Sequence, residues 1–329
     1  MAKHMKNNAV SIIAGPCSID ENNIREVKEI SKITVINRLG HQQKAIAGTR
    51  IVGLKSRTAL HTSGDGMGID YPSFMRNTAV LLQGGKMPDM ETPPSVLIAE
   101  EISQNTGMII ATEIMSPLVQ LPHYVGRIPQ GKLLPWNPAV EQLGWPIMQM
   151  AHFARRCGWH IGLKNGKWVG EHLHIANSPD YQGKTSMEKT WAGLVSFVGK
   201  IAGDIVLIHR GVDVPEKDRY RNAVIHEISR RTKLATGVKL YLDPSHSHGP
   251  NMRDQIVAAT VEALKIKISN SQFLYDGVLV ETGSSTTDTE QHITIEELKQ
   301  MVKKVAKFRD LVKPESHKSK TDRVNYQFA

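Results

Sequence analysis

Reactive and charged side chains follow seven short apolar runs of this 329-residue chain. In chain order, these side chains are Cys17, Lys55, Arg57, Thr58, Glu113, Lys164, Arg210, His246 and Glu281. Any one of them alone could be an ordinary core or surface residue. Chance placement, however, rarely puts such a group after seven of eight apolar runs. The set therefore predicts a functional site, and most of its members fall into two chemical groups.

The first group consists of cations. Lys55, Arg57, Lys164 and Arg210 would together make a strongly positive pocket. Arginine binds phosphate and carboxylate through two parallel hydrogen bonds, and lysine adds a compact positive charge. These four residues predict a pocket for a small anion.

The second group consists of metal-capable side chains. Cys17, His246, Glu281 and the nearby Asp288 offer one sulfur, one nitrogen and two oxygen ligands. Mixed ligation of this kind suits a divalent ion such as Mn, Fe, Co or Zn, which can act as a Lewis acid. An anion pocket beside a Lewis acid implies a phosphorylated substrate with a carbonyl group that the metal polarises.

Eight apolar, often β-branched runs are the elements that must position these groups. The runs are Ser11–Ala14, Arg50–Leu54, Met108–Thr112, Lys132–Pro135, His160–Leu163, Ile205–Ile208, Lys239–Leu242 and Gly277–Val280. Helix-like stretches lie between them, including Ser95–Gln104, Pro146–Arg156, Arg221–Arg231 and Met252–Lys267. This alternation predicts parallel β-α-β units, and eight units predict a (β/α)8 TIM barrel, in which all the strands end at one mouth. An open, doubly wound sheet is the alternative.

Composition narrows the class of protein. Apolar residues make up 40% of the chain and charged residues 22%, which is enough to fill a core. No apolar stretch is long enough to span a membrane, and the protein is not expected to associate with one. Two cysteines cannot build a disulfide framework, so a reducing cytoplasm is the expected location.

The net charge of +9 is concentrated near the end of the chain. Residues 303–323 hold eight Lys or Arg and three Asp or Glu, which leaves a net +5 there. The rest of the chain is only weakly basic, so a nucleic-acid partner is not expected. A homo-oligomer is expected.

Three segments are predicted along the chain. Residues 1–10 read as an N-terminal extension or tag remnant, and so little precedes the first strand that no N-terminal regulatory domain is expected. Residues 11–312 form the barrel, with a last helix over Glu296–Val312. Residues 313–329 are polar and basic and are expected to be a flexible tail.

Five ordered motifs resemble the superfamily of 3-deoxy-D-arabino-heptulosonate 7-phosphate (DAHP) synthase and KDO 8-phosphate synthase. They are Ile13-Ala14-Gly15-Pro16-Cys17-Ser18-Ile19, Lys55-Ser56-Arg57-Thr58, Leu163-Lys164-Asn165-Gly166, Asp243-Pro244-Ser245-His246 and Thr287-Asp288-Thr289-Glu290-Gln291. They appear in the family's order and span nearly the whole chain.

The resemblance implies a metal-dependent transferase that condenses phosphoenolpyruvate with an aldose phosphate. With erythrose 4-phosphate this reaction gives DAHP and phosphate, in the shikimate pathway of aromatic amino acid biosynthesis. Carried over by position, the metal ligands would be Cys17, His246, Glu281 and Asp288. Lys55, Arg57, Thr58, Lys164 and Arg210 would bind substrate, and Lys55 and His246 would take part in catalysis.

The fourth strand departs from the family pattern. DAHP synthases usually place an arginine there, whereas this chain reads Leu134-Pro135-Trp136-Asn137-Pro138. Trp136 and Asn137 are therefore expected to face the substrate, while Trp145 is expected to pack in the core. KDO 8-phosphate synthases also lack that arginine, but the Lys-x-Arg-Thr and Asp-Pro-Ser-His forms favour the DAHP type. Condensation with another aldose phosphate, and a non-catalytic anion-binding barrel, are the alternatives.

Overall fold

The computed structural model describes residues 8–55, 67–166 and 170–314 of the chain. Arg57, Thr58 and most of the predicted C-terminal tail lie outside the described residues. Within the described residues, no helix is long and apolar enough to cross a membrane.

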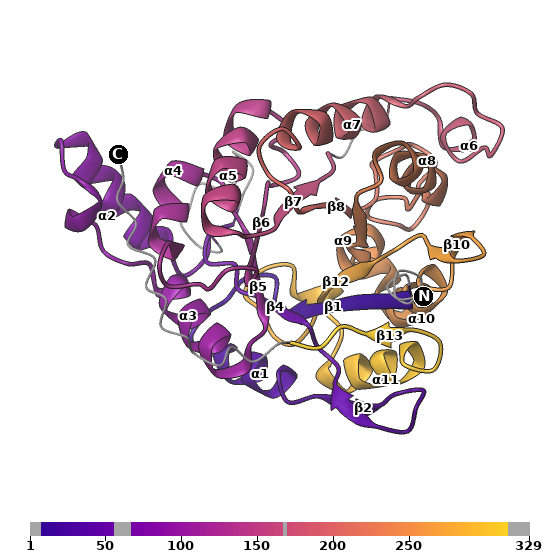
Figure 1. Cartoon of the computed structure of the whole chain (residues 1–329), viewed down its shortest axis with the longest axis horizontal. Helices are drawn as coiled ribbons and strands as arrows, with labels where there is room; N and C mark the ends of the chain where they lie inside the picture. The colour runs from indigo at the N-terminus through magenta and orange to yellow at the C-terminus, as the bar shows by residue number, and fades with distance from the viewer. Residues whose placement is uncertain (1–7, 56–66, 167–169, 315–329) are drawn as a thin grey trace.

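Eight parallel strands form a closed barrel (Figure 1). In chain order they are β1 (Ala9–Gly15), β4 (Gly48–Arg50), β5 (Ile109–Glu113), β6 (Leu133–Trp136), β7 (Ile161–Lys164), β8 (Ile205–His209), β9 (Lys239–Leu242) and β12 (Gly277–Glu281). Each strand pairs with the next, and β12 returns to pair with β1. This closure confirms the predicted (β/α)8 barrel and excludes the open sheet.

Helices surround the strands, as Figure 1 shows. The α-helices are α1 (Ile24–Ile30), α2 (Tyr71–Leu82), α3 (Pro94–Thr106), α4 (Pro117–Gln120), α5 (Gly144–Cys157), α6 (Leu173–Ala176), α7 (Ser186–Val198), α8 (His226–Thr236), α9 (Pro244–His248), α10 (Ile256–Ala263) and α11 (Ile295–Val305). Short 3-10 turns are η2 (Met87–Asp89), η3 (Leu121–Tyr124), η4 (Pro250–Gln255) and η5 (Thr289–Gln291). Local sequence fixes several ends: Thr185 and Thr294 begin α7 and α11 with capping boxes to Glu188 and Glu297.

Five short strands lie outside the closed barrel. β2 (Thr34–Ile36) pairs with β3 (Gln42–Lys44), and β10 (Lys267–Ser269) pairs with β11 (Gln272–Phe273). The fifth, β13 (Asp310–Leu311), pairs with the start of β1. The first strand and the last helix therefore differ from their predicted bounds. The first strand begins at Ala9, inside the predicted extension, and the last helix ends at Val305 because the chain returns to the sheet as β13.

Two further boundaries differ from the predicted ones. The second strand was expected over residues 50–54, but the paired backbone is Gly48–Arg50, against β5, and the residues after it are buried at the strand end. The helix predicted from Arg221 begins at His226, because the backbone N–H groups of residues 221–223 donate to carbonyls of neighbouring segments. In both cases backbone pairing, which local sequence does not show, decides the boundary.

The core has two layers separated by the sheet. The inner cluster takes residues only from the strands or their immediate ends: Ile13, Val52, Ala111, Leu134, Trp136, Val206, Ile208, Tyr241 and Leu279. The larger outer cluster lies between strands and helices. Gly162 also faces inward, since a Cβ there would lie 2.7 Å from Cβ of Trp136. Because strand side chains alternate between faces, this inner layer determines which residue of each strand reaches the mouth.

Candidate metal centre and anion pocket

A layer of charged side chains lies on the inward face of the strand ends. Glu113, Lys164, Asp243 and Glu281 each stand two residues after an inward-facing position of the same strand, at 111, 162, 241 and 279. All four are buried, at 4% exposure or less. Buried charges need partners or ligands, so this layer is where chemistry is expected.

Four of the predicted metal ligands come together here. Ligand atoms of Cys17, His246 and Glu281 all lie within 4.8 Å of one another. Asp288 joins them: its Oδ2 is 3.6 Å from Cys17 Sγ and 3.9 Å from His246 Nε2. Donors bound to one metal ion at about 2.0–2.3 Å lie at most about 4.5 Å apart, so both of these separations fit a shared ion.

Asp243 sets the orientation of the His246 ring. Nδ1 of His246 lies 3.0 Å from Asp243, which directs Nε2 toward Asp288. A carboxylate on the far ring nitrogen is the usual support of a metal-binding histidine. Burial lowers the pKa of His246, although Asp243 and Glu281 oppose this, so the ring is held neutral, the form that binds metals.

The remaining donors also suit a cation. Burial and the nearby Glu281 raise the pKa of the Cys17 thiol to about 12, so a thiolate here needs a cation beside it. For Glu281, burial favours the neutral acid, but His246 and Arg50 hold the pKa of this carboxyl well below its usual range. A sulfur, a nitrogen and two carboxylates therefore fit a borderline divalent metal, as the sequence predicted.

Three of the four cations that were predicted to bind an anion lie within the described residues. Lys164 Nζ lies 2.9 Å from Asp243, and Lys55 Nζ lies 3.7 Å from Glu113. Arg210 is 3% exposed, and its Nε and Nη1 have no hydrogen-bond partner within the described part of the chain. Burial lowers the pKa of Arg210, and likewise that of Lys164 despite Asp243 and Glu113. Buried guanidinium nitrogens without partners are suited to an incoming anion. The fourth predicted cation, Arg57, and Thr58 lie outside the described residues.

Arg50 belongs to this site, although its sequence context suggested only the start of a strand. Its side chain is fully buried, with Nη2 3.0 Å from Glu281 Oε1 and Nη1 unpartnered among the described residues. Counting by twos from the inward apolar residues would have found Arg50. Glu113, which the sequence placed at a strand end without a role, also belongs here: burial would raise its pKa, but Lys55 and Lys164 bring it to about 2.

The two residues predicted to replace the family arginine behave differently from each other. Trp136 is fully buried and lies beneath the cations, with its ring centroid 5.4 Å from Arg50 and 5.8 Å from Lys164. Asn137 faces away from the barrel axis, and its amide is bonded to backbone, accepting from the Lys164 N–H at 2.8 Å. Its predicted place facing the substrate is therefore wrong, because the alternation that turns Trp136 inward turns Asn137 outward.

Trp145 also corrects an expectation. It was expected to pack in the core, but it is 72% exposed at the start of α5. The buried face of that helix is supplied by later residues, including Ile147 and Met150.

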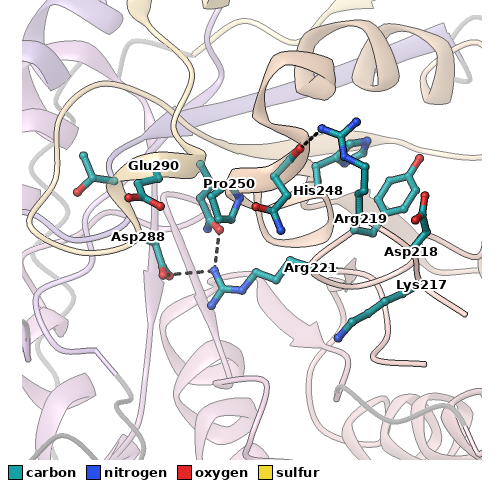
Figure 2. A pocket seen from close by; sticks show the side chains of 12 residues that line it. Lys217, Asp218, Arg219, Arg221, His248, Pro250, Asp288 and Glu290 are labelled. Carbon is teal, nitrogen blue, oxygen red and sulfur yellow. Dashed lines mark hydrogen bonds and ion pairs between the residues drawn. The ribbon is translucent and has the colours of Figure 1, made fainter. Parts of the chain in front are cut away.

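A cavity of about 680 Å³ opens beside the metal-ligand cluster (Figure 2). Its walls come from the loops after β8, β9 and β12, and Asp288 and Arg221 are among them. Figure 2 shows the Arg221 guanidinium reaching toward Asp288 at one side of this cavity.

No protein-family model and no curated protein sequence matches the chain. Its structure is similar to two solved structures from Thermotoga maritima. Phospho-2-dehydro-3-deoxyheptonate aldolase (DAHP synthase) matches with a TM-score of 0.65 and 16% identity, over 93% of this chain and 72% of that one. A truncated form of 3-deoxy-D-arabino-heptulosonate 7-phosphate synthase matches with a TM-score of 0.61 and 16% identity, over 93% and 90%. The chain therefore has the (β/α)8 fold of the DAHP synthases.

Proposed function

We propose that this protein is a metal-dependent enzyme that condenses phosphoenolpyruvate with an aldose phosphate, erythrose 4-phosphate being the preferred candidate. The products are a 3-deoxy-2-ulosonate phosphate and inorganic phosphate. One observation carries the proposal: the buried Arg210 and Lys164 share the barrel mouth with four converging metal donors. A phosphorylated enol and a carbonyl group are the substrates that such a pair of sites serves.

The anion pocket would hold phosphoenolpyruvate. Arg210 and Lys164 would bind its phosphate and carboxylate. Among the described residues, two nitrogens of Arg210 and one of the buried Arg50 have no hydrogen-bond partner. Fixing both charged ends orients the enol carbon toward the metal donors, which lowers the entropic part of the barrier.

The aldehyde group of the aldose would lie over Cys17, His246, Glu281 and Asp288. A divalent metal bound there would polarise the aldehyde oxygen as a Lewis acid. C3 of the enol then attacks the aldehyde carbon, water adds at C2, and phosphate leaves by cleavage of its bond to C2.

Lys55 Nζ lies 3.7 Å from Glu113, in the layer of charged side chains at the barrel mouth. Its charge acts on both Cys17 and Glu113, and although burial disfavours the charged form, these neighbours raise its pKa above the ordinary lysine value. Lys55 therefore stays protonated, and we propose that it stabilises negative charge and supplies a proton during the condensation, while His246 serves as a metal ligand.

Two other functions remain as candidates. Condensation with another aldose phosphate is favoured by the absence of an arginine at the end of β6, where Trp136 and Asn137 stand. A non-catalytic anion-binding barrel would keep the cation pocket but turn over nothing.

Phosphate release from phosphoenolpyruvate separates these three. The protein is treated with EDTA, reloaded with Mn²⁺, and assayed with erythrose 4-phosphate, ribose 5-phosphate and arabinose 5-phosphate, with product masses recorded. We expect release that requires both the metal and an aldose phosphate and is fastest with erythrose 4-phosphate. Full activity after chelation, or release without any aldose, would overturn the proposal. Binding without release would favour the non-catalytic barrel.

A further inference from the structure

We propose that Arg221 is a positioning residue that holds two of the metal-ligand carboxylates, Asp288 directly and Glu281 through Gln291. This inference rests on the proposed function, because it concerns the same metal centre. Arg221 lies in the loop after β8, outside every motif that the sequence singled out.

The contacts form one continuous chain. Nη1 of Arg221 lies 3.2 Å from Asp288 Oδ1 and donates a hydrogen bond to Gln291 Oε1 at 2.6 Å (Figure 2). The amide Nε2 of Gln291 in turn donates to Glu281 Oε2. One guanidinium therefore connects carboxylates that come from two different segments, the end of β12 and the turn before η5.

The two oxygens of Asp288 have different roles. Oδ1 faces Arg221, whereas Oδ2 faces Cys17 Sγ and His246 Nε2. Holding Oδ1 fixes the rotation of the carboxylate, so that Oδ2 stays with the other donors. The two oxygens of Glu281 also have different partners. Oε2 accepts from Gln291, whereas Oε1 pairs with Arg50 and faces His246.

Asp288 needs such support because its backbone is in the left-handed region, with φ of 50°. Among the described residues, the one other non-glycine residue with positive φ is Asp218, on the wall of the same cavity. A non-glycine residue in this conformation is held there by its surroundings. The Arg221 guanidinium contacts the Asp288 side chain and so belongs to these surroundings.

Arg221 is itself anchored to the segment that carries His246. Its N–H donates to the His248 carbonyl at 3.1 Å, and the neighbouring Asn222 amide donates to the His246 carbonyl at 2.6 Å. Gly249 is required for this fit, since a Cβ there would lie 2.5 Å from Cβ of Arg221. Backbone contacts thus connect Arg221 to the segment of His246, which is also a proposed metal ligand.

Metal affinity is the property that tests the inference. Groups that orient metal ligands typically contribute about tenfold to hundredfold in affinity. The Mn²⁺ dissociation constant of the full chain would be measured at one pH by titration calorimetry and by the free-ion EPR signal. We expect Arg221→Met to weaken Mn²⁺ binding by about tenfold to hundredfold, and Arg221→Lys to recover part of the loss.

A double-mutant cycle tests the link through Gln291. We expect Gln291→Ala to weaken binding less than Arg221→Met, and the double variant to lose less than the product of the two single losses, because the contacts act as a unit. Arg219→Met is the matched control. Arg219 lines the same cavity but bonds to the Asn251 carbonyl, so its removal should leave Mn²⁺ affinity unchanged.

Three results would overturn the inference: unchanged affinity in Arg221→Met, an equal loss in Arg219→Met, or single losses that simply multiply in the double variant. Should Arg221→Met fold poorly by circular dichroism, Arg221→Lys and Gln291→Ala make the same comparison. A failure of the proposed function looks different, since the unchanged protein would then show no phosphate release that depends on both Mn²⁺ and an aldose phosphate, whatever the order of Mn²⁺ affinities among the variants.

Discussion

Lys164 and Asn165 are consecutive residues at the end of β7, yet they belong to two different regions of the barrel. Lys164 lies on the inward face, beside Asp243 and above Trp136. Asn165 lies behind the sheet, where its Oδ1 accepts the Arg210 N–H at 2.8 Å. The inner surface of the mouth thus carries groups that can bind a ligand, and the layer behind it carries groups whose hydrogen bonds are made to backbone.

The same arrangement occurs one strand earlier. Asn137, directly after β6, accepts the Lys164 N–H at 2.8 Å, as Asn165 does for Arg210. Each outward asparagine therefore positions the backbone of the inward cation on the next strand. The comparison teaches that polar residues at neighbouring strand ends divide into ligand-binding and supporting groups by the face on which they lie.

The largest expected effect separates the two cysteines. Cys17 is inward, among the metal donors, whereas Cys157 ends α5 in the outer layer, and both are buried thiols. Cys17→Ala should weaken Mn²⁺ binding by at least about a hundredfold, because it removes a proposed direct ligand, and the protein should keep its fold. Cys157→Ala should keep wild-type Mn²⁺ affinity. Equal Mn²⁺ binding by both variants in calorimetry would remove Cys17 from the centre.

The inward cations come next. Lys164→Ala or Arg210→Ala should cost about 1.5–3 kcal/mol of binding free energy, the usual contribution of a hydrogen bond to a charged group. This corresponds to roughly tenfold to hundredfold weaker phosphoenolpyruvate binding. Lys239→Ala, at the exposed start of β9, is the control and should not change the affinity. If the Lys164 and Arg210 variants bind phosphoenolpyruvate as tightly as the parent, the anion pocket is wrongly placed.

The outward asparagines should affect stability more than binding. Asn137→Ala leaves the buried N–H of Lys164 without its acceptor, which should lower the free energy of unfolding by about 1–3 kcal/mol. Urea denaturation measures this loss of stability. Calorimetry should show that Asn137→Ala loses less affinity for phosphoenolpyruvate than Lys164→Ala does. A larger loss of affinity than of stability would mean that Asn137 contacts the substrate after all.

The smallest effect is expected at Trp145. Because its side chain is 72% exposed, Trp145→Ala should change the free energy of unfolding by less than about 0.5 kcal/mol. Trp136 lies in the inner layer, so Trp136→Ala should by contrast lower the free energy of unfolding by about 3–5 kcal/mol. Similar urea midpoints for the two variants would contradict the placement of these indoles.

Much of the barrel could be predicted from the sequence because its strands are buried on both faces and read as apolar runs. Cys17, His246 and Asp288 could be proposed as metal ligands because each stands in a recognisable motif, and Glu281 because it directly follows a buried apolar run. Arg50 was missed although a signal existed: it is two residues from an inward apolar position, Val52.

Other features could not have been found in this way. Arg221 reaches Asp288 across 67 positions of sequence, and only the pairing of its loop with the His246 segment brings them together. The strand β13 is two residues long and is determined by its partner β1, not by its own composition. Contacts between loops and the register of short strands depend on the closed barrel, which local patterns do not describe.

A crystal structure of the protein soaked with Mn²⁺ and phosphoenolpyruvate, with anomalous data collected at the manganese edge, tests the central claim most directly. The account predicts one strong anomalous peak within bonding distance of Cys17, His246, Glu281 and Asp288. It also predicts that the phosphate and carboxylate of phosphoenolpyruvate lie on Lys164 and Arg210. A peak elsewhere, or phosphoenolpyruvate bound away from these two cations, would contradict it.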